Sequence, residues 1–254
     1  MGRTIIHFHR QSQAEFAKKF TLLCKTKSSW QVWADFLTLS AIAISNLLDR
    51  EGKIHDDREK EYLSIIKQYS PQERQVFPEL LALLTDALNK EPKQDFLGEM
   101  FMSFGLGNHW KGQFFTSYTV CQLIAGMNIE NQQNQIQKQG WISINDPCCG
   151  AGALLIAARN EMVKHDISPQ QVLYVAQDID RTAALMCYLQ LSLLGCAGYV
   201  IVGDTLIHPS VSPTSSPLLI APPKGEEVWL MPAFYDATWV YRVQFEKLKM
   251  ADNA

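Results

Sequence analysis

Hydrophobic residues recur at helical spacing through the first hundred residues of the chain. The positions that share a helix face are Ala14, Phe16, Ala17, Phe20 and Leu23, followed by Trp30, Trp33, Phe36, Leu37, Ile42 and Leu47. Ser28-Ser29 can cap the second of these helices, and Ser70-Pro71-Gln72-Glu73 has the form of a capping box with proline at the first helical position. This pattern predicts an α-helical domain over residues 1–105.

From Trp141 onward, short apolar runs alternate with helical ones. The apolar runs that predict strands are Trp141–Ile144, Val172–Ala176, Tyr199–Val202 and Leu218–Ala221. Helices are predicted at Ala153–His165 and Arg181–Leu194, and the polar segment Glu130–Gln139 is predicted to be a surface connection. Such alternation is typical of βαβ units around a parallel sheet, so we expect an α/β domain over residues 106–254.

The last part of the chain is rich in aromatic residues. Glu227–Met231 and Thr238–Phe245 are candidates for one or two further strands. We expect the aromatic residues of this part mainly to cover the sheet, namely Trp229, Phe234, Tyr235, Trp239 and Tyr241.

Composition narrows the class of protein. The 23 basic and 26 acidic residues give a net charge of −3, which does not indicate nucleic-acid binding and still permits a local basic face. The six cysteines include no CxxC pair, so we expect reduced, mostly buried thiols in a cytoplasmic protein. His7 and His9 have no further ligands nearby, and we expect a surface arm with no metal.

Targeting signals are not predicted. Residues 1–10 lack the apolar core of a signal peptide. The longest apolar-rich stretch, Phe36–Leu48, is too short and too often interrupted to span a bilayer. We therefore expect no membrane association.

The most informative stretch is Asp146-Pro147-Cys148-Cys149-Gly150-Ala151-Gly152, which follows a predicted strand and precedes a predicted helix. A strand, a small-residue turn and a helix is the arrangement that places a nucleotide-like ligand against a helix N-terminus. Gly150 and Gly152 can adopt backbone angles that a Cβ atom disfavours, and they let a ligand approach closely.

Three acids fall at or just beyond the ends of predicted strands, namely Asp146, Asp178 and Asp204. The carboxyl ends of parallel strands meet at one edge, so these acids should converge on the ligand crevice of an open α/β sheet. They predict a nucleoside-like cofactor. The alternative is that they are helix caps and loop starters.

These residues resemble the N6-adenine DNA methyltransferases, and within that family the modification subunits of type I restriction systems. The stretch from Asp146 to Gly152 resembles the family's Asp-Pro-x-x-Gly-x-Gly loop for S-adenosylmethionine. The segment Gly112–Ser117 resembles its Gly-x-Phe-Phe/Tyr-Thr-Pro motif, and Asp95–Glu99 resembles its Asp-x-Leu-Gly-x segment. The likeness extends from about Asp95 to Gly225.

The resemblance implies a Rossmann-like S-adenosylmethionine-dependent methyltransferase sheet preceded by an α-helical domain. It implies that Asp178 binds the ribose hydroxyls and that Asp204 lies near the adenine amino group. The cofactor-binding residues carried over are Phe115, Thr116, Asp146, Pro147, Gly150, Gly152, Asp178 and Asp204. An NAD-dependent enzyme stays as an alternative, although the third glycine of the dinucleotide fingerprint is missing.

One family motif is degenerate. Family enzymes place Asp/Asn-Pro-Pro-aromatic at the end of the fourth strand, where the polar group and the following carbonyl hold the target amine. This chain reads Ala221-Pro222-Pro223-Lys224, so Pro222 and Pro223 are the remnant of the catalytic tetrad. Loss of one positioned polar group costs about 2.7–4 kcal/mol of transition-state stabilisation. The alternative is that these prolines only begin a loop.

Two functions follow from the resemblance. The first is an S-adenosylmethionine-dependent DNA methyltransferase of the N6-adenine type with weak or lost activity, acting on DNA and working with a specificity partner that reads sequence. The second is a non-catalytic S-adenosylmethionine-binding subunit or regulator in a DNA-modification or mobile-element context. Transfer to another amine is a third option. Whether the chain is an enzyme and whether it forms homo- or hetero-oligomers stay open.

Overall fold

The computed structural model describes residues 10–107, 115–211, 216–220 and 225–252. The chain divides into two compact units, residues 1–115 and residues 116–254. The sequence prediction placed the division between residues 105 and 106.

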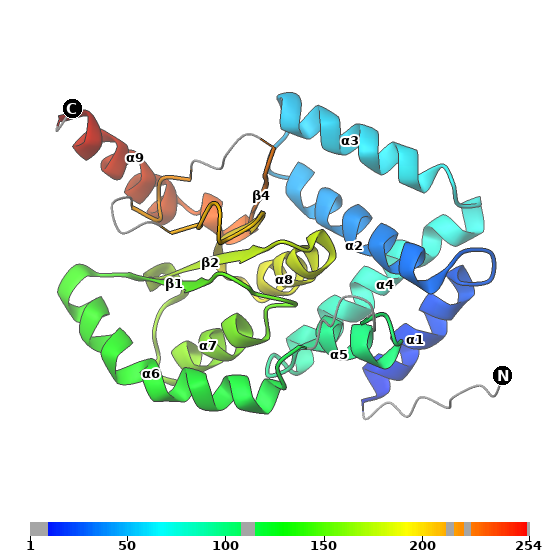
Figure 1. The fold of residues 1–254 in the computed structure, drawn as a ribbon, viewed down its shortest axis with the longest axis horizontal. Helices are drawn as coiled ribbons and strands as arrows, with labels where there is room; N and C mark the ends of the chain where they lie inside the picture. Colours follow the sequence, from blue (N-terminus) through cyan, green and yellow to red (C-terminus); the bar gives the residue numbers. More distant parts are fainter. Residues whose placement is uncertain (1–9, 108–114, 212–215, 221–224, 253–254) are drawn as a thin grey trace. The chain divides into compact units, whose positions relative to one another are not determined.

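The first unit is helical in its described part (Figure 1). Its helices are α1 (Gln11–Leu23), α2 (Ser29–Asn46), α3 (Lys53–Ile66), α4 (Pro71–Lys90) and α5 (Phe96–Ser103). Aromatic rings fill its core, with the Phe16 ring centroid 5.5 Å from those of both Phe36 and Phe96. All three rings are fully buried, so the periodic apolar positions of the sequence form this core.

The predicted helix caps are present. The Ser28 hydroxyl accepts a hydrogen bond from Gln31 N at 3.2 Å at the start of α2. At the start of α4, Ser70 Oγ accepts from Glu73 N at 3.3 Å and Ser70 N donates to Glu73 Oε2 at 2.8 Å. This reciprocal pair is a capping box, and Pro71 occupies the first helical position.

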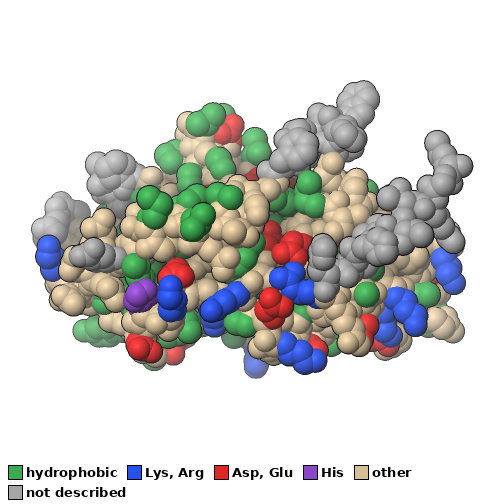
Figure 2. Space-filling view, turned by 90° about the horizontal axis from the view of Figure 1, so that it is seen from below, with side chains coloured by type: hydrophobic (Ala, Val, Ile, Leu, Met, Phe, Trp, Pro, Cys, Tyr) green, Lys and Arg blue, Asp and Glu red, His purple; other side chains and the backbone are tan. Residues whose placement is uncertain are grey.

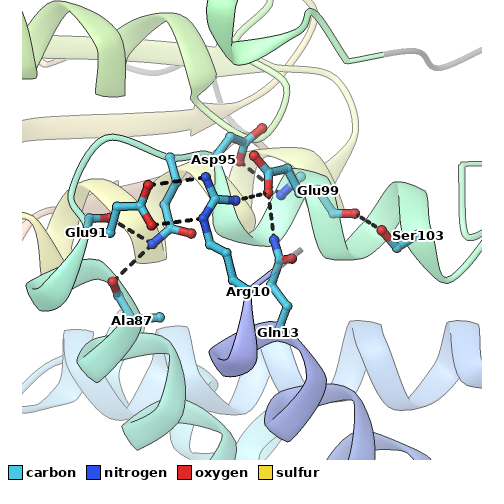
Figure 3. Close-up of polar contacts among 9 residues, drawn as sticks. Arg10, Gln13, Ala87, Glu91, Asp95, Glu99 and Ser103 are labelled. Carbon is cyan, nitrogen blue, oxygen red and sulfur yellow. Dashed lines mark hydrogen bonds and ion pairs between the residues drawn. The ribbon is translucent and has the colours of Figure 1, made fainter. Parts of the chain in front are cut away.

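A polar cluster joins the start of α1 to the segment Asp95–Glu99 (Figure 3). Arg10 forms ion pairs with Glu91 at 2.9 Å and with Glu99 at 2.6 Å. The buried Asp95 side chain accepts a hydrogen bond from Gly98 N at 2.9 Å and so caps α5. A Cβ atom on Gly98 would lie 2.0 Å from Asp95 Oδ2, which explains why glycine follows the aspartate at this spacing.

The second unit is a mixed α/β structure (Figure 1). Its helices are α6 (Tyr118–Gln139), α7 (Ala153–Lys164), α8 (Arg181–Leu193) and α9 (Ala237–Asp252), with 3-10 turns η1 (Pro169–Gln171) and η2 (Pro232–Tyr235). Its strands are β1 (Ile142–Asp146), β2 (Val172–Asp178), β3 (Ala197–Val202) and β4 (Glu227–Leu230). Among the described residues the sheet order is β1-β2-β3-β4, with β4 antiparallel to β3 and the other pairs parallel. The predicted α/β class is confirmed.

Three local predictions are wrong. Glu130–Gln139 continues α6, because its glutamine and lysine residues favour helix and Gly140, at φ +82°, ends it. Thr238–Phe245 lies in α9 rather than in a strand. Leu218 lies in a turn with Pro217, Leu219 is at a bend, and Ile220 is in no regular element, so this predicted strand is not formed over its described residues. Leu218 is buried against the sheet face, and Pro217 before it has no N–H to donate to a strand ladder.

The two faces of the sheet are covered by different parts of the chain. On one face, Leu173, Val175 and Tyr199 pack in a cluster with Phe234 and Trp239, from η2 and α9. The predicted role of these two aromatic residues in covering the sheet is thus confirmed, whereas Tyr241 of α9 is largely exposed, so the prediction is wrong for that residue. Trp229 of β4 is buried as well, and its ring centroid lies 5.5 Å from that of Tyr188 in α8. The other face packs against α8 and α7.

Two further observations concern the described chain as a whole. Within it, no helix combines the length and apolar character needed to cross a bilayer. All six cysteines are free thiols, and four of them are buried, as the sequence predicted for most of them.

Candidate functional site

Asp146 and Asp178 end neighbouring parallel strands. Asp146 pairs with Ala176 in the β1–β2 ladder, and Asp178 pairs with Val202 in the β2–β3 ladder. Because paired residues share a face and side chains alternate along a strand, both carboxylates lie on the same face. The structure therefore brings these two predicted acids together at one edge of the sheet.

The turn from Pro147 to Gly152, which we call the glycine loop, connects β1 to α7. Asp146 Oδ1 accepts a hydrogen bond from Cys148 N at 3.2 Å, and Gly152 N donates to Cys149 O at 2.8 Å. Gly150 has φ +53° and Gly152 has φ +93°, backbone conformations that side chains disfavour. A Cβ atom on Gly152 would also lie 2.9 Å from Cys187 Sγ, so this glycine permits close packing of the loop on α8.

Asp178 fixes the glycine loop to the end of β2. Its Oδ2 atom accepts a hydrogen bond from Gly150 N at 2.9 Å, and its Oδ1 atom accepts from Asp180 N at 2.9 Å. Each carboxylate oxygen can accept a further hydrogen bond, so the group can still bind a hydroxyl donor. Asp180 itself caps α8, with Oδ1 accepting from Thr182 N at 2.8 Å.

Asp204 begins a turn that directly follows β3. Gly203 N donates to Asp178 O at 3.0 Å, which holds the start of this turn at the end of β2. Asp204 Oδ1 accepts from Leu206 N at 2.9 Å, and Asp204 O accepts from His208 N at 2.8 Å. The third predicted acid thus follows the third parallel strand at the same edge.

Burial raises the pKa of Asp146 and of Asp178 above the ordinary value of an aspartate. For Asp146, the hydrogen bond from Cys148 N acts in the opposite direction, and the nearby charge of Asp178 raises the pKa further. For Asp178, backbone hydrogen bonds from Asp180 and Gly150 oppose the effect of burial. Burial therefore makes the ionised form of each acid less favourable than it would be on the protein surface.

The remaining predicted residues lie at the boundary between the two units or outside the described residues. Phe115 is the last residue of the first unit, and its ring centroid lies 5.5 Å from that of Phe101. Thr116 is exposed and precedes Ser117, the N-cap of α6. The segment 112–114 lies outside the described residues. So do Ala221 and Lys224, with Pro222 and Pro223 between them.

Sequence reasoning missed two buried glutamines, Gln177 and Gln190. The side chain of Gln190, on α8, donates to Ala151 O in the glycine loop at 2.9 Å. The side chain of Gln177 donates to His208 O at 2.9 Å and accepts from Ser210 N at 2.8 Å. For Gln177, the sequence did contain a signal, namely an amide at the end of an otherwise apolar predicted strand. A buried amide needs hydrogen-bond partners, so such a residue indicates contacts with a neighbouring loop.

Surface charge gives no simple indication of a ligand. Basic and acidic side chains are interspersed on the face shown in Figure 2, so the described residues form no continuous basic area there. Several cations are paired with acids, for example Arg181 with Glu227 at 2.9 Å. Within the described part of the chain, no three His, Cys, Asp or Glu side chains are grouped so as to hold a metal ion.

The fold and the site define an α/β protein with acids and a glycine loop at the carboxyl edge of parallel strands. A model of the N-6 DNA methylase family matches residues 95–253, well over half of the 254 residues. The chain therefore belongs to the N-6 DNA methylase family. No curated protein and no solved structure gives a significant match.

The family implies S-adenosylmethionine as methyl donor and DNA as substrate. The groups at the carboxyl edge fit such a cofactor chemically, because ionised carboxylates accept hydrogen bonds from the hydroxyl and amino groups of an adenosine and a methionine. No phosphate has to be bound, so a loop with two glycines suffices. Asp146, Asp178 and Asp204 are the residues that would hold it.

Replacement of Asp146 by asparagine should alter how stability depends on pH. Because the pKa of Asp146 is raised in the folded state, the folded protein binds this proton more tightly than the unfolded chain does. The protonated group therefore contributes to the free energy of unfolding at low pH, and this contribution is lost as pH rises through the raised pKa. Asp146→Asn keeps the acceptor for Cys148 N and has no proton to lose. We expect the stability of the variant relative to wild type to increase as pH rises above the ordinary pKa of an aspartate, about 3.9, and to level off once pH has passed the raised pKa of Asp146.

Urea unfolding at several pH values measures this change, with Asp57→Asn on the exposed face of α3 as the matched substitution. A difference in the free energy of unfolding between wild type and Asp146→Asn that stays constant as pH rises would contradict the assignment of a raised pKa to Asp146.

Proposed function

We propose that the carboxyl edge of β1, β2 and β3 binds S-adenosylmethionine and that the protein is a DNA methyltransferase of the N6-adenine type with weakened transfer. The observation that carries the proposal is the hydrogen-bonded end of β2. There Asp178 holds the glycine loop through Gly150 and the Asp204 turn through Gly203. This arrangement fits a ligand that needs acceptors at several points and close approach to a loop backbone.

The roles follow the motif positions and the chemistry of each group. Asp178 accepts hydrogen bonds from the ribose hydroxyls, and Asp204 accepts from the adenine amino group. Asp146 and the glycine loop, including Pro147, Gly150 and Gly152, bind toward the methionine end, together with Phe115 and Thr116. The bound cofactor supplies an activated methyl group, and ionised acceptors would favour its amino and hydroxyl donors.

The doubt about catalysis comes from the sequence of the tetrad. Ala221 has no side-chain acceptor for a target amine, and Lys224 has no aromatic face on which a flipped base could stack. Both losses favour slow transfer. They also favour a second candidate function, a non-catalytic S-adenosylmethionine-binding subunit or regulator that assembles with a partner in a restriction-modification system or a mobile element. In either case we propose a cytoplasmic protein, in line with its free, largely buried thiols.

Calorimetric titration with S-adenosylmethionine tests the cofactor site. We expect wild type to bind and Asp146→Ala to weaken affinity by about tenfold or more, because a hydrogen bond to a charged group is lost. Asp57→Ala, at an exposed acid in the first unit, is the matched control and should bind as wild type does. Absence of binding by folded wild type would refute the cofactor assignment.

Transfer of a tritiated methyl group to unmethylated DNA tests catalysis. We expect the double variant Ala221→Asn/Lys224→Phe to exceed wild type by on the order of a hundredfold, because it restores a positioned polar group and a stacking ring. Rapid incorporation by wild type, with no gain in the double variant, would show that the tetrad is not degenerate in function. Cofactor binding without transfer by either protein would favour the non-catalytic subunit.

A further inference from the structure

Gln177 is the next-to-last residue of β2, directly before Asp178, and it is completely buried. The five residues before it in the strand are apolar or aromatic and buried too. An unpaired amide in such a place would cost free energy, yet both polar atoms of this side chain have partners. Nε2 donates to His208 O at 2.9 Å, and Oε1 accepts from Ser210 N at 2.8 Å.

Both partners belong to the end of the turn that carries Asp204. His208 N donates to Asp204 O at 2.8 Å, so residues 204–208 form one closed turn. The start of this turn is held by the hydrogen bond from Gly203 N to Asp178 O at 3.0 Å. Two consecutive residues of β2 therefore hold the Asp204 turn at its two ends.

The backbone of Gln177 reaches the other ligand loop. Its carbonyl oxygen accepts a hydrogen bond from Cys149 N at 3.0 Å, next to the bond between Gly150 N and Asp178 Oδ2. The side chain of Gln177 thus acts on the Asp204 turn, whereas its carbonyl acts on the glycine loop. A substitution of the side chain changes only the first of these contacts.

We infer that Gln177 is a positioning residue that sets the orientation of Asp204 for a ligand bound at the carboxyl edge. The inference rests on the proposed function, in which Asp204 accepts from the adenine amino group. The turn has other anchors: His208 Nδ1 lies 3.3 Å from Glu226 Oε1, and Ser210 Oγ lies 3.1 Å from Asn145 Oδ1. Loss of the Gln177 amide should therefore loosen the turn without unfolding the protein.

Gln177→Met tests the inference, because methionine has a similar shape and cannot make these two hydrogen bonds. Gln190→Met is the matched control, because Gln190 is equally buried and holds Ala151 of the glycine loop instead. The first measurement is hydrogen–deuterium exchange of the protein without ligand. We expect residues 205–210 to exchange about tenfold faster in Gln177→Met and to be unchanged in Gln190→Met.

The second measurement is a double-mutant cycle on the dissociation constant for S-adenosylmethionine. Gln177→Met alone should weaken binding about tenfold, and it should have less than about a twofold effect when Asp204→Ala is already present. The effects of Gln190→Met and Asp204→Ala should multiply, as should those of Gln177→Met and Asp146→Ala. A residue with a merely structural role would not couple selectively to Asp204.

The two measurements distinguish the positioning role of Gln177 from the assignment of an S-adenosylmethionine site. Faster exchange of the turn in Gln177→Met, together with a wild type that binds no S-adenosylmethionine, would support the role of Gln177 in holding the turn and refute the cofactor assignment. Unchanged exchange of residues 205–210 in Gln177→Met would overturn the inference whether or not the cofactor binds. So would equal effects of Gln177→Met with and without Asp204→Ala.

Discussion

The hydrogen bonds at the end of β2 are the constraint on which the candidate site depends. Gln177 and Asp178 are the last two residues of β2, whose earlier residues are buried and apolar or aromatic. Their polar atoms form hydrogen bonds with the loop after β1 and the loop after β3. Gly150 N donates a hydrogen bond to the Asp178 carboxylate, and Gly203 N donates one to the backbone carbonyl of Asp178. The loops after β1 and β3 are therefore both anchored to the end of β2 by hydrogen bonds.

This construction has an energetic cost that ligand binding would offset. Burial raises the pKa of Asp146 and Asp178, so the ionised form of each is less stable in the folded protein than on an exposed aspartate. Donors from a bound adenosine and methionine would stabilise the charged forms. Groups that lower the stability of the free protein in this way are common at binding sites, where a residue is selected because it binds the ligand.

Periodicity and short motifs in the sequence predicted most of the α/β unit up to β3. β1, β2 and β3 and the helices between them lie close to their predicted bounds, and the glycines of the loop have the positive φ angles that their type suggested. Leu218–Ala221 looked like a strand because its residues are apolar, yet tertiary packing buries Leu218 against the sheet face instead. Gln177 was missed because the hydrogen-bond partners of its side chain, His208 and Ser210, are 31 and 33 residues away in the sequence, which no local pattern reveals.

We propose that the carboxyl edge of β1, β2 and β3 is an S-adenosylmethionine site. A crystal structure of the protein with S-adenosylhomocysteine, the demethylated product, tests it most directly. We expect the ribose hydroxyls within about 3 Å of the Asp178 carboxylate and the adenine amino group near Asp204. A ligand bound away from the glycine loop, or one whose ribose contacts neither acid, would contradict it.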